Sequence, residues 1–395
     1  MLRPMRQEWD MHFASGGPEA LERLDRAPCD VIVSDMRMPG MDGAQLLAEV
    51  RKRHPMTVRF ALSGHTEPDM ILRAIGPTHQ FLAKPCDADL LKTSVSRVCT
   101  LRELLPDKTL TQMVTGIETL PSDPAVYQQV VAAVASPNSS LDAIAQTISS
   151  DLGMTAKMLQ LVHSAFFGLQ RHLPNPVQAV DILGLDTVQS LVLTAQVFSY
   201  ADSTTMGELS LDTLWRHGMA VGSCARHIAD MMGCDQTMLD DTFTAGLLHD
   251  IGIVILAAHL PEYHVRIKAH VESEDSTYWQ AEKAIFGASH AEIGAYLMGL
   301  WGLPASIVNA LAYHHDPTAH SDHTFSPLTA VHVANVMVRT LMAGDQPDRH
   351  RQFDNAYLEA LDLTDQLPSW WAGCKQTLNR IQGDPEPELR KISHA

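Results

Sequence analysis

Three residues near the start of the chain could together carry out phosphoryl transfer. Asp35, Ser63 and Lys84 each stand at or just after the end of a short apolar run. A carboxylate such as Asp35 can accept a phosphoryl group as a nucleophile, and a divalent metal ion would offset the charge. Lys84 would pair with the phosphoryl oxygens, and Ser63 could hydrogen-bond the new phosphate and draw its loop inward. These residue types therefore predict an acceptor carboxylate with two supporting groups.

A second set of residues has the composition of a divalent-metal site. The chain has 20 histidines, many of them between His217 and His332, and one of these is followed directly by an aspartate. Imidazole and carboxylate groups are the usual ligands of metal-dependent hydrolases. Buried histidines can instead be satisfied by carbonyl or carboxylate partners in a helical core, and the sequence leaves this alternative open. The candidates are His217, His249, Asp250, His290, His314 and His315.

The elements that must position the first set are strands that alternate with helices. Continuous apolar runs of this length are typical of buried parallel strands. Their alternation with helical patterns predicts a doubly wound α/β domain over residues 1–105, with helices on both faces of a parallel sheet. The expected strands are residues 29–35, 58–63 and 80–84, and the expected helices are residues 19–24, 44–53 and 68–74.

Beyond about residue 105 the strand patterns end and helical patterns begin. Val126, Val130 and Val134, for example, share one helix face. The same kind of periodicity continues past residue 340. We predict an all-α domain over residues 106–345, followed by a C-terminal helical tail over residues 346–395.

Composition limits the classes of partner and the location of the protein. The net charge of −17, without any run of five or six Lys/Arg residues, excludes a global basic field that would attract nucleic acid. No continuous apolar stretch predicts a membrane span, and the first residues lack the apolar region of a signal peptide. The six cysteines are scattered without a Cys-x-x-Cys pair, which is typical of reduced thiols. We expect a cytoplasmic protein that binds neither nucleic acid nor membrane, and the sequence leaves a homodimer open.

The motifs around the first candidate site resemble the receiver domains of response regulators. Asp35 begins the run DMRMPGMDG, Ser63 lies in the segment ALSG, and Lys84 is followed by proline. The resemblance covers about residues 1–100 and implies a flavodoxin-like fold. It implies that Asp35 is the phospho-acceptor, Ser63 the switch hydroxyl and Lys84 the characteristic lysine. It also implies a Mg²⁺ ion, with the backbone carbonyl of Arg37 among its ligands, and a sensor histidine kinase as partner.

One feature of receiver domains has no counterpart in this sequence. Receivers open with a strand that ends in an acidic pair holding Mg²⁺, and no such strand precedes Leu2. We expect either a start assigned too late or a degraded receiver that lacks its first strand. Without the acidic pair, Mg²⁺ binding and phosphorylation of Asp35 are expected to be weak. A missing central strand would also leave backbone groups of the neighbouring strands unpaired, which is costly.

The helical part resembles the HD superfamily of metal-dependent phosphohydrolases, and more closely its HDOD branch. The motifs GMTAKMLQL, HDIG, WGLP and YHHDP occur in this order between about residues 110 and 340. The resemblance places each candidate histidine at a ligand position of the HD pattern. Because imidazole ligands dominate, the implied ion is Zn²⁺, Fe²⁺ or Mn²⁺. We expect convergence on one site between helices, with His217 nearby, for His249, Asp250, His290, His314 and His315.

Three departures from catalytic HD-GYP phosphodiesterases argue against hydrolysis. Ile253 stands where a lysine follows the HDxG motif, Asn335 stands in place of a final aspartate, and the Gly-Tyr-Pro segment is missing. We therefore predict a response regulator that is not an enzyme, in which phosphorylation at the receiver modulates a non-catalytic HDOD domain that binds a downstream signalling protein. The alternatives are a metal-dependent phosphohydrolase acting on a cyclic dinucleotide or another nucleotide, and a constitutive scaffold with a remnant receiver.

Overall fold

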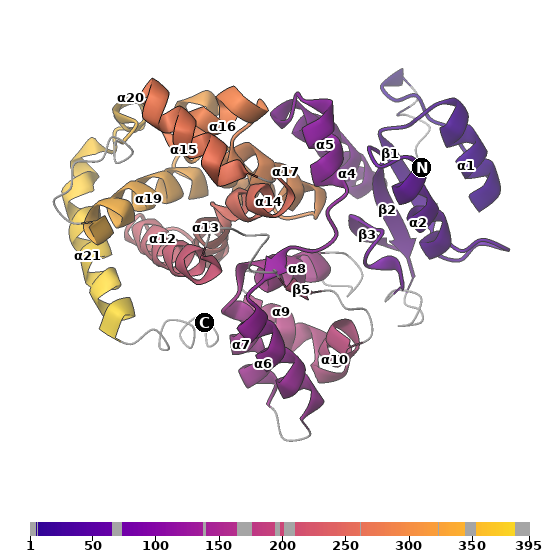
Figure 1. The fold of residues 1–395 in the computed structure, drawn as a ribbon, viewed down its shortest axis with the longest axis horizontal. Helices are drawn as coiled ribbons and strands as arrows, with labels where there is room; N and C mark the ends of the chain where they lie inside the picture. Colours follow the sequence, from indigo (N-terminus) through magenta and orange to yellow (C-terminus); the bar gives the residue numbers. More distant parts are fainter. Residues whose placement is uncertain are drawn as a thin grey trace.

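The protein has a small α/β part at one end and a larger helical part, as Figure 1 shows. The strands of the α/β part lie on the right of this view, and the later helices lie on the left. The structure is a computed structural model. The residues that it describes are 5, 7–64, 73–136, 140–163, 176–193, 198–200, 210–260, 262–322, 324–343 and 353–383.

A parallel sheet forms the first part and confirms the predicted α/β fold. Its elements are α1 (Gly17–Arg26), β1 (Val31–Asp35), α2 (Gly43–Arg53), β2 (Val58–Ser63), β3 (Gln80–Ala83) and α4 (Ala88–Leu101). The strand order is β1-β2-β3, with Asp35 opposite Leu62 and Ser63 opposite Ala83. This register brings the carboxyl ends of the three strands to one edge of the sheet. Of the helix expected at residues 68–74, residues 68–72 lie outside the described residues, and the last two are helical.

The last two residues of the motif DMRMPGMDG, Asp42 and Gly43, have a structural role at the start of α2. The Asp42 carboxylate accepts from the backbone N–H of Gln45 at 2.8 Å, and the Gln45 side chain accepts from the Asp42 N–H at 3.0 Å, which completes a capping box. A Cβ at Gly43 would lie 2.2 Å from the carbonyl oxygen of Asp35. Only glycine lets the start of α2 approach the backbone that carries Asp35 this closely.

The second part is built from helices, with one exception among the described residues. Pro121–Ser122 (β4) and Ser199–Tyr200 (β5) form a short parallel pair that the sequence did not predict. The predicted all-helical class of this part is otherwise confirmed. Its first helices are η2 (Arg102–Leu104), α5 (Lys108–Thr115), α6 (Pro124–Ala135), α7 (Leu141–Ser149), α8 (Leu152–His163), α9 (Pro176–Leu183) and α10 (Leu185–Leu193). The later ones are α12 (Leu211–Met231), α13 (Gln236–Leu248), α14 (Ile251–His259), α15 (Tyr263–Glu274), α16 (Tyr278–Phe286), α17 (His290–Leu300), α18 (Ala305–Tyr313), η4 (Pro317–Ala319), α19 (Pro327–Ala343), α20 (Asn355–Ala360), η5 (Thr364–Gln366) and α21 (Leu367–Gly383).

The core of the helical part forms around α12, which packs against α13, α19 and α21. α17 packs in turn against α14 and α18. Helix α21 belongs to the segment expected as a tail, and its Trp370 is fully buried. The apolar stretch Gln236–His259 is long enough to cross a membrane by length and composition, but 83% of its most apolar window is buried inside the protein. It has the burial of a core helix.

The α/β part and the helical part are joined through α17. Helices α4 and α5 and the short η2 all contact α17, and they lie between it and the sheet in Figure 1. The Gln80 side-chain amide donates to the carbonyls of Gly299 and Leu300 at 3.3 and 3.0 Å. The Leu101 side chain packs so closely on Gly299 that a Cβ there would lie 2.4 Å from it. The first strand residue of β3 is therefore bonded directly to the end of a helix of the other part.

Two buried cations lie near this junction. The Lys157 ammonium donates to the carbonyl of Glu118 at 2.6 Å and lies 5.1 Å from the centre of the Trp301 ring. The Arg59 guanidinium, on β2, donates to the carbonyl of Pro77 at 2.6 Å. Burial lowers the pKa of Lys157 to about 7, and burial together with Arg51 lowers that of Arg59 to about 9. Burying a cation without a carboxylate partner costs stability.

Lys157→Met is expected to raise the free energy of unfolding at pH 6.5 by about 1–2 kcal/mol, because removal of the buried charge outweighs the lost hydrogen bond to Glu118. The unfolded lysine keeps its ordinary pKa of 10.5, so between about pH 7 and 10.5 the unfolded chain binds more protons than the folded one. Wild-type stability should rise with pH across this window, and the advantage of the variant should shrink. Urea unfolding at pH 6.5 and 9.5 measures the stability of the wild type and the advantage of the variant. Lys375→Met is the control, because Lys375 is exposed. An advantage of equal size at the two pH values would contradict the assignment.

Candidate functional site

The first candidate site lies at the carboxyl edge of the sheet. Lys84, just after β3, forms an ion pair with the carboxylate of Asp35, at the end of β1. The backbone N–H of Arg37 donates to the same carboxylate at 3.1 Å. Burial would raise the pKa of Asp35, but the bonds from Lys84 and from this backbone N–H hold it below its ordinary value. Asp35 is therefore ionised and partly exposed, as a phosphoryl acceptor must be.

The switch hydroxyl expected at Ser63 lies on the neighbouring strand. Its Oγ donates to the carbonyl of Gly64 at 3.0 Å, and Leu62, the residue before it, pairs with Asp35 in the sheet. The structure thus brings Asp35, Ser63 and Lys84 to one edge, as the order of the strands requires.

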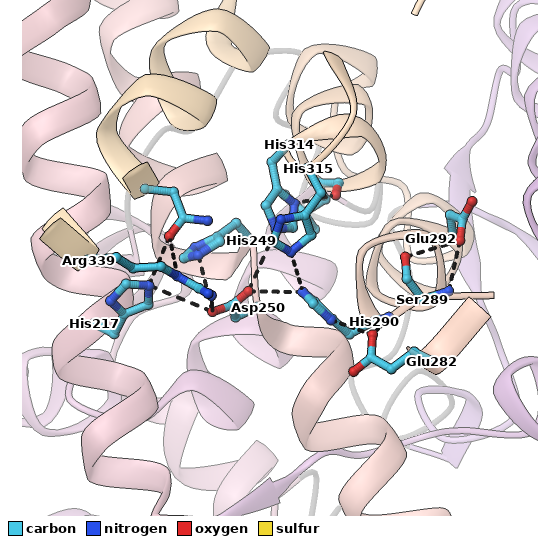
Figure 2. Close-up of polar contacts among 12 residues, drawn as sticks. His217, His249, Asp250, Glu282, Ser289, His290, Glu292, His314, His315 and Arg339 are labelled. Atoms are coloured by element: carbon cyan, nitrogen blue, oxygen red, sulfur yellow. Dashed lines mark hydrogen bonds and ion pairs between the residues drawn. The ribbon is translucent and has the colours of Figure 1, made fainter. Parts of the chain in front are cut away.

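The second candidate site is centred on the buried carboxylate of Asp250, which Figure 2 shows between the histidines. Its Oδ1 lies 3.2 Å from Nε2 of His290 and 3.7 Å from Nε2 of His314. Its Oδ2 lies 3.2 Å from Nε2 of His249 and 3.8 Å from Nε2 of His217. One carboxylate therefore faces two pairs of imidazoles.

His315 completes the cluster on the His290 side. Its Nε2 lies 3.0 Å from Nε2 of His290, and its ring lies 4.0 Å from that of His314. The ring of Trp279 stacks on His315 with an angle of 7° between the planes. The structure brings all six candidate residues together. They form two groups that share Asp250: Asp250, His290, His314 and His315; and His217, His249 and Asp250.

Helix ends converge at the cluster. His249 follows the last residue of α13, and Asp250 precedes the first residue of α14. His290 is the first residue of α17, and His314 follows the last residue of α18. His217 lies in the interior of α12. Residues at helix ends can point along the helix axis into a shared space, so four helix ends meet at one site and α12 contributes His217 as a fifth helix.

Two histidines each use Nδ1 in a hydrogen bond, so the lone pair of each Nε2 is directed into the cluster. Nδ1 of His249 lies 2.7 Å from the carbonyl of Gly246, and Nδ1 of His314 lies 2.8 Å from that of Leu311. A carbonyl only accepts, so each Nδ1 carries the proton and each Nε2 is an acceptor. Both Nε2 atoms and Oδ1 of Asp250 are buried, and none has a hydrogen-bond partner among the described residues. Buried acceptors of this kind are costly. Nε2 of His314 and Oδ1 of Asp250 belong to one ligand group, and a divalent cation there would satisfy both of them.

Glu282, on α16, is a member of the site that the sequence did not predict. Its Oε2 accepts from Nδ1 and from the backbone N–H of His290 at 2.6 and 2.7 Å, and its Oε1 accepts from the Tyr263 hydroxyl. A carboxylate on the outer nitrogen of a histidine is the usual support of a metal-binding imidazole. Glu282 falls outside every sequence motif, and only the packing of α16 on α17 brings it to His290.

The charges in the cluster are strongly coupled. Burial would lower the pKa of His290, but Glu282 and Asp250 raise it to about 10. Burial opposes ionisation of Asp250, yet the imidazoles of His249 and His290 and the guanidinium of Arg339 hold its pKa well below the ordinary value. Burial, with His249, lowers the pKa of His217 to about 4. Without a metal, the site at neutral pH holds the Asp250 carboxylate and an imidazolium at His290, and burial keeps His217, His314 and His315 neutral.

The side of the cluster near His217 contains an amide and a guanidinium, from Asn335 and Arg339. Oδ1 of Asn335 lies 3.1 Å from Nε2 of His217 and accepts from Nε of Arg339 at 3.0 Å. Nη2 of Arg339 lies 3.5 Å from Oδ2 of Asp250. The sequence predicted that Asn335 would stand for a carboxylate, but it did not predict Arg339. A guanidinium beside Oδ2 already supplies a positive charge, which disfavours a second divalent ion on this side.

The fold and these two sites define a phospho-receiver joined to a helical output domain. The model of the HDOD domain matches residues 120–317, half of the chain, so the chain belongs to the HDOD family. The model of the response regulator receiver domain matches residues 1–96. Both resemblances drawn from the sequence are confirmed, and with them the class: a response regulator of two-component signalling with an HDOD output domain.

Several known proteins share parts of this chain. An uncharacterized protein of Treponema pallidum is 28% identical over 226 residues, which is 57% of this chain and 43% of that protein. The DNA-binding transcriptional regulator NtrC of Escherichia coli K12 is 39% identical over 82 residues, 20% of this chain and 18% of NtrC. The chain thus spans less than half the length of these relatives. The crystal structure of the MmoQ response regulator from Methylococcus capsulatus matches 64% of this chain and 98% of its own, with 19% identity and a TM-score of 0.48.

Proposed function

We propose that a sensor histidine kinase phosphorylates this response regulator at Asp35, and that the phosphorylated receiver controls a non-catalytic HDOD domain that binds a downstream signalling protein. A receiver domain implies a cognate kinase. The acceptor geometry at Asp35, with Lys84 beside it, supports phosphorylation at this residue. Mg²⁺ bound at the carboxylate would offset the charge of the incoming phosphoryl group.

The observation that carries the proposal is a connection between the two sites through β3 and α17. Lys84, just after β3, is paired with Asp35. Gln80, the first residue of β3, is bonded to the carbonyls of Gly299 and Leu300 at the end of α17. The other end of α17 is His290, in the histidine cluster. A phosphoryl group on Asp35 would take Lys84 as a partner, and the resulting shift of β3 would act on α17 through Gln80.

A small phosphodonor with Mg²⁺ is expected to label Asp35 and to change amide hydrogen exchange in α17. Labelling should require Mg²⁺, because the ion offsets the charge of the incoming phosphoryl group. Asp35→Asn should abolish the label, since an amide cannot accept the phosphoryl group. Intact-mass and hydrogen-exchange mass spectrometry measure both effects.

Two matched variants make this test specific. Asp10→Asn, which changes an exposed carboxylate, should leave the labelling unchanged. Gln80→Leu should still be labelled but lose most of the exchange change in α17, because it removes the bond between β3 and that helix. Unchanged exchange in fully labelled wild-type protein would refute control of the HDOD domain through α17.

We also propose that the HDOD domain holds one borderline divalent ion, Zn²⁺, Fe²⁺ or Mn²⁺, at Asp250, His290, His314 and His315. The supporting features are the buried acceptors without partners and the Glu282 carboxylate behind His290. Such an ion would supply Lewis-acid chemistry or fix the four helix ends in place. Residues behind the ligands orient the imidazoles. The carbonyl of Leu311 holds Nδ1 of His314, and the carboxylate of Glu282 holds Nδ1 of His290.

A metal-dependent phosphohydrolase is the second candidate, and the same ligand set favours it. Against it stand Ile253 in place of lysine and Asn335 in place of aspartate. Incubation of the protein with cyclic dinucleotides and Mn²⁺, Fe²⁺ or Mg²⁺ over hours is expected to give no product. Product that disappears in His249→Ala would establish an enzyme instead.

A further inference from the structure

A pocket of about 280 Å³ lies beside the histidine cluster. His290 and His315 form part of its lining, together with Arg339, Trp279 and Ile253. The pocket therefore opens onto the side of the cluster where Nε2 of His290 and Nε2 of His315 meet. It combines a cation, aromatic rings and apolar surface, which is the composition of a small-molecule site.

Arg339 places a guanidinium at the wall of this pocket. Two of its contacts hold the guanidinium in place, one to Asn335 and one to Asp250. A guanidinium has five N–H donors, and these contacts involve only Nε and Nη2. The structure records no further acceptor for it among the described residues, and 30% of its side chain is exposed. A pre-positioned guanidinium with unused donors is suited to an anion, and to phosphate or carboxylate above all.

Arg339 and Ile253 face the same pocket. Both side chains line the pocket, although Ile253 lies on α14 and Arg339 on α19. The apolar side chain of Ile253 cannot contact a charged group favourably. At this wall of the pocket the positive charge therefore comes from α19 and not from the helix that follows the HDIG motif.

Aromatic side chains supply another part of the wall. Tyr278 and Trp279 begin α16 and line the pocket, and half of the Tyr278 side chain is exposed. The one pocket carboxylate, Glu282, is engaged by His290 and Tyr263. Aromatic rings near a cation recognise a flat organic group that carries a negative charge.

We propose that this pocket binds a small organic phosphate of mononucleotide size, with its phosphate on Arg339 and its ring against Trp279 and Tyr278. The volume lies near the lower end of small-molecule sites, about 300 Å³, so a dimeric nucleotide would not be enclosed. The inference extends the proposed function, since it makes the output domain a sensor of a small ligand as well as of Asp35 phosphorylation. The ligand is bound and not consumed.

Isothermal titration of the full chain with adenosine 5′-monophosphate, adenosine, inorganic phosphate and a cyclic dinucleotide tests the proposal, with and without Mn²⁺. The monophosphate should bind most tightly of the four. Arg339→Gln should weaken its binding about 10- to 100-fold, the value of a charge-assisted hydrogen bond, and Arg339→Lys should restore part of the loss. Trp279→Leu should weaken binding of the monophosphate about 5-fold or more and leave inorganic phosphate unaffected.

Arg216→Gln is the matched control, because Arg216 is exposed and, among the residues that the structure describes, pairs only with Asp212 on its own helix. The thermal unfolding midpoint of each variant checks that it is folded. Equal binding of adenosine and its monophosphate, no measurable binding of the monophosphate, or unchanged binding in Arg339→Gln would each overturn the proposal. Asp35→Asn should bind the monophosphate normally. Arg339-dependent binding in a protein that fails to respond at α17 would therefore leave this inference standing and refute the proposed function alone.

Discussion

Asp250→Asn is expected to reduce metal affinity by about 100-fold or more, because Asp250 belongs to both ligand groups and supplies their only carboxylate. The substitution keeps the shape of the side chain and removes its charge. Purified wild-type protein should carry a single Zn²⁺, Fe²⁺ or Mn²⁺ ion per chain, and the variant should carry almost none. Metal analysis after dialysis measures the content, and competition with a chelator measures the affinity.

The histidine variants show which group holds the ion. His314→Gln should lose most of the metal, whereas His217→Gln should retain it, because Arg339 and Asn335 occupy the surroundings of His217. His12→Gln, in the exposed N-terminal region, is the control. The reverse order of effects would place the ion on the other side of Asp250. A metal-free wild-type protein would show that the histidines form a hydrogen-bonded core only.

Metal binding should also release a proton near neutral pH. The pKa of His290 is raised to about 10 by Glu282 and Asp250, so its ring is an imidazolium before the ion enters. An ion bound at Nε2 must displace that proton, while Nδ1–H stays on Glu282. Affinity should therefore rise with pH between about 6 and 9 and fall sharply in acid, where protonated imidazoles cannot ligate. Titrations in buffers of different ionisation enthalpy count the protons, and affinity independent of pH would contradict this picture.

Gly252→Ala is expected to lower the free energy of unfolding by about 3 kcal/mol and to disrupt the cluster as well. A Cβ at Gly252 would lie 1.9 Å from the carbonyl oxygen of His290. Helices α14 and α17 would have to separate, and His290 would move away from Asp250.

Urea unfolding and metal content of the Gly252→Ala variant measure these two effects. Gly16→Ala is the matched control, since nothing lies within 4 Å of a Cβ there, and its stability should change by less than about 0.5 kcal/mol. A stable Gly252→Ala variant with normal metal content would show that the two helices can adjust without moving the ligands.

Local sequence patterns were sufficient to predict which residues meet at the receiver-like site. Asp35, Ser63 and Lys84 each end or follow a continuous apolar strand, and parallel strands place their carboxyl ends at one edge. The pair Asp35 and Lys84 is therefore in contact although 49 residues separate them. The six metal candidates were predicted through the order of the HD motifs, because each motif marks a helix end that the family pattern brings to one place.

The sequence by itself determined the two fold classes, the acceptor edge and the members of the histidine cluster, because each depends on periodicity or on a local motif. Only the tertiary structure decided what surrounds those residues. Glu282 supports His290 from another helix, and Arg339 supplies a cation in a pocket where the HDIG motif has an isoleucine. Gln80 bonds to a helix more than 200 residues away, at Gly299 and Leu300. These contacts arise from how helices and a strand that share no sequence pattern pack together. Packing follows the whole set of buried side chains and not any local stretch of sequence.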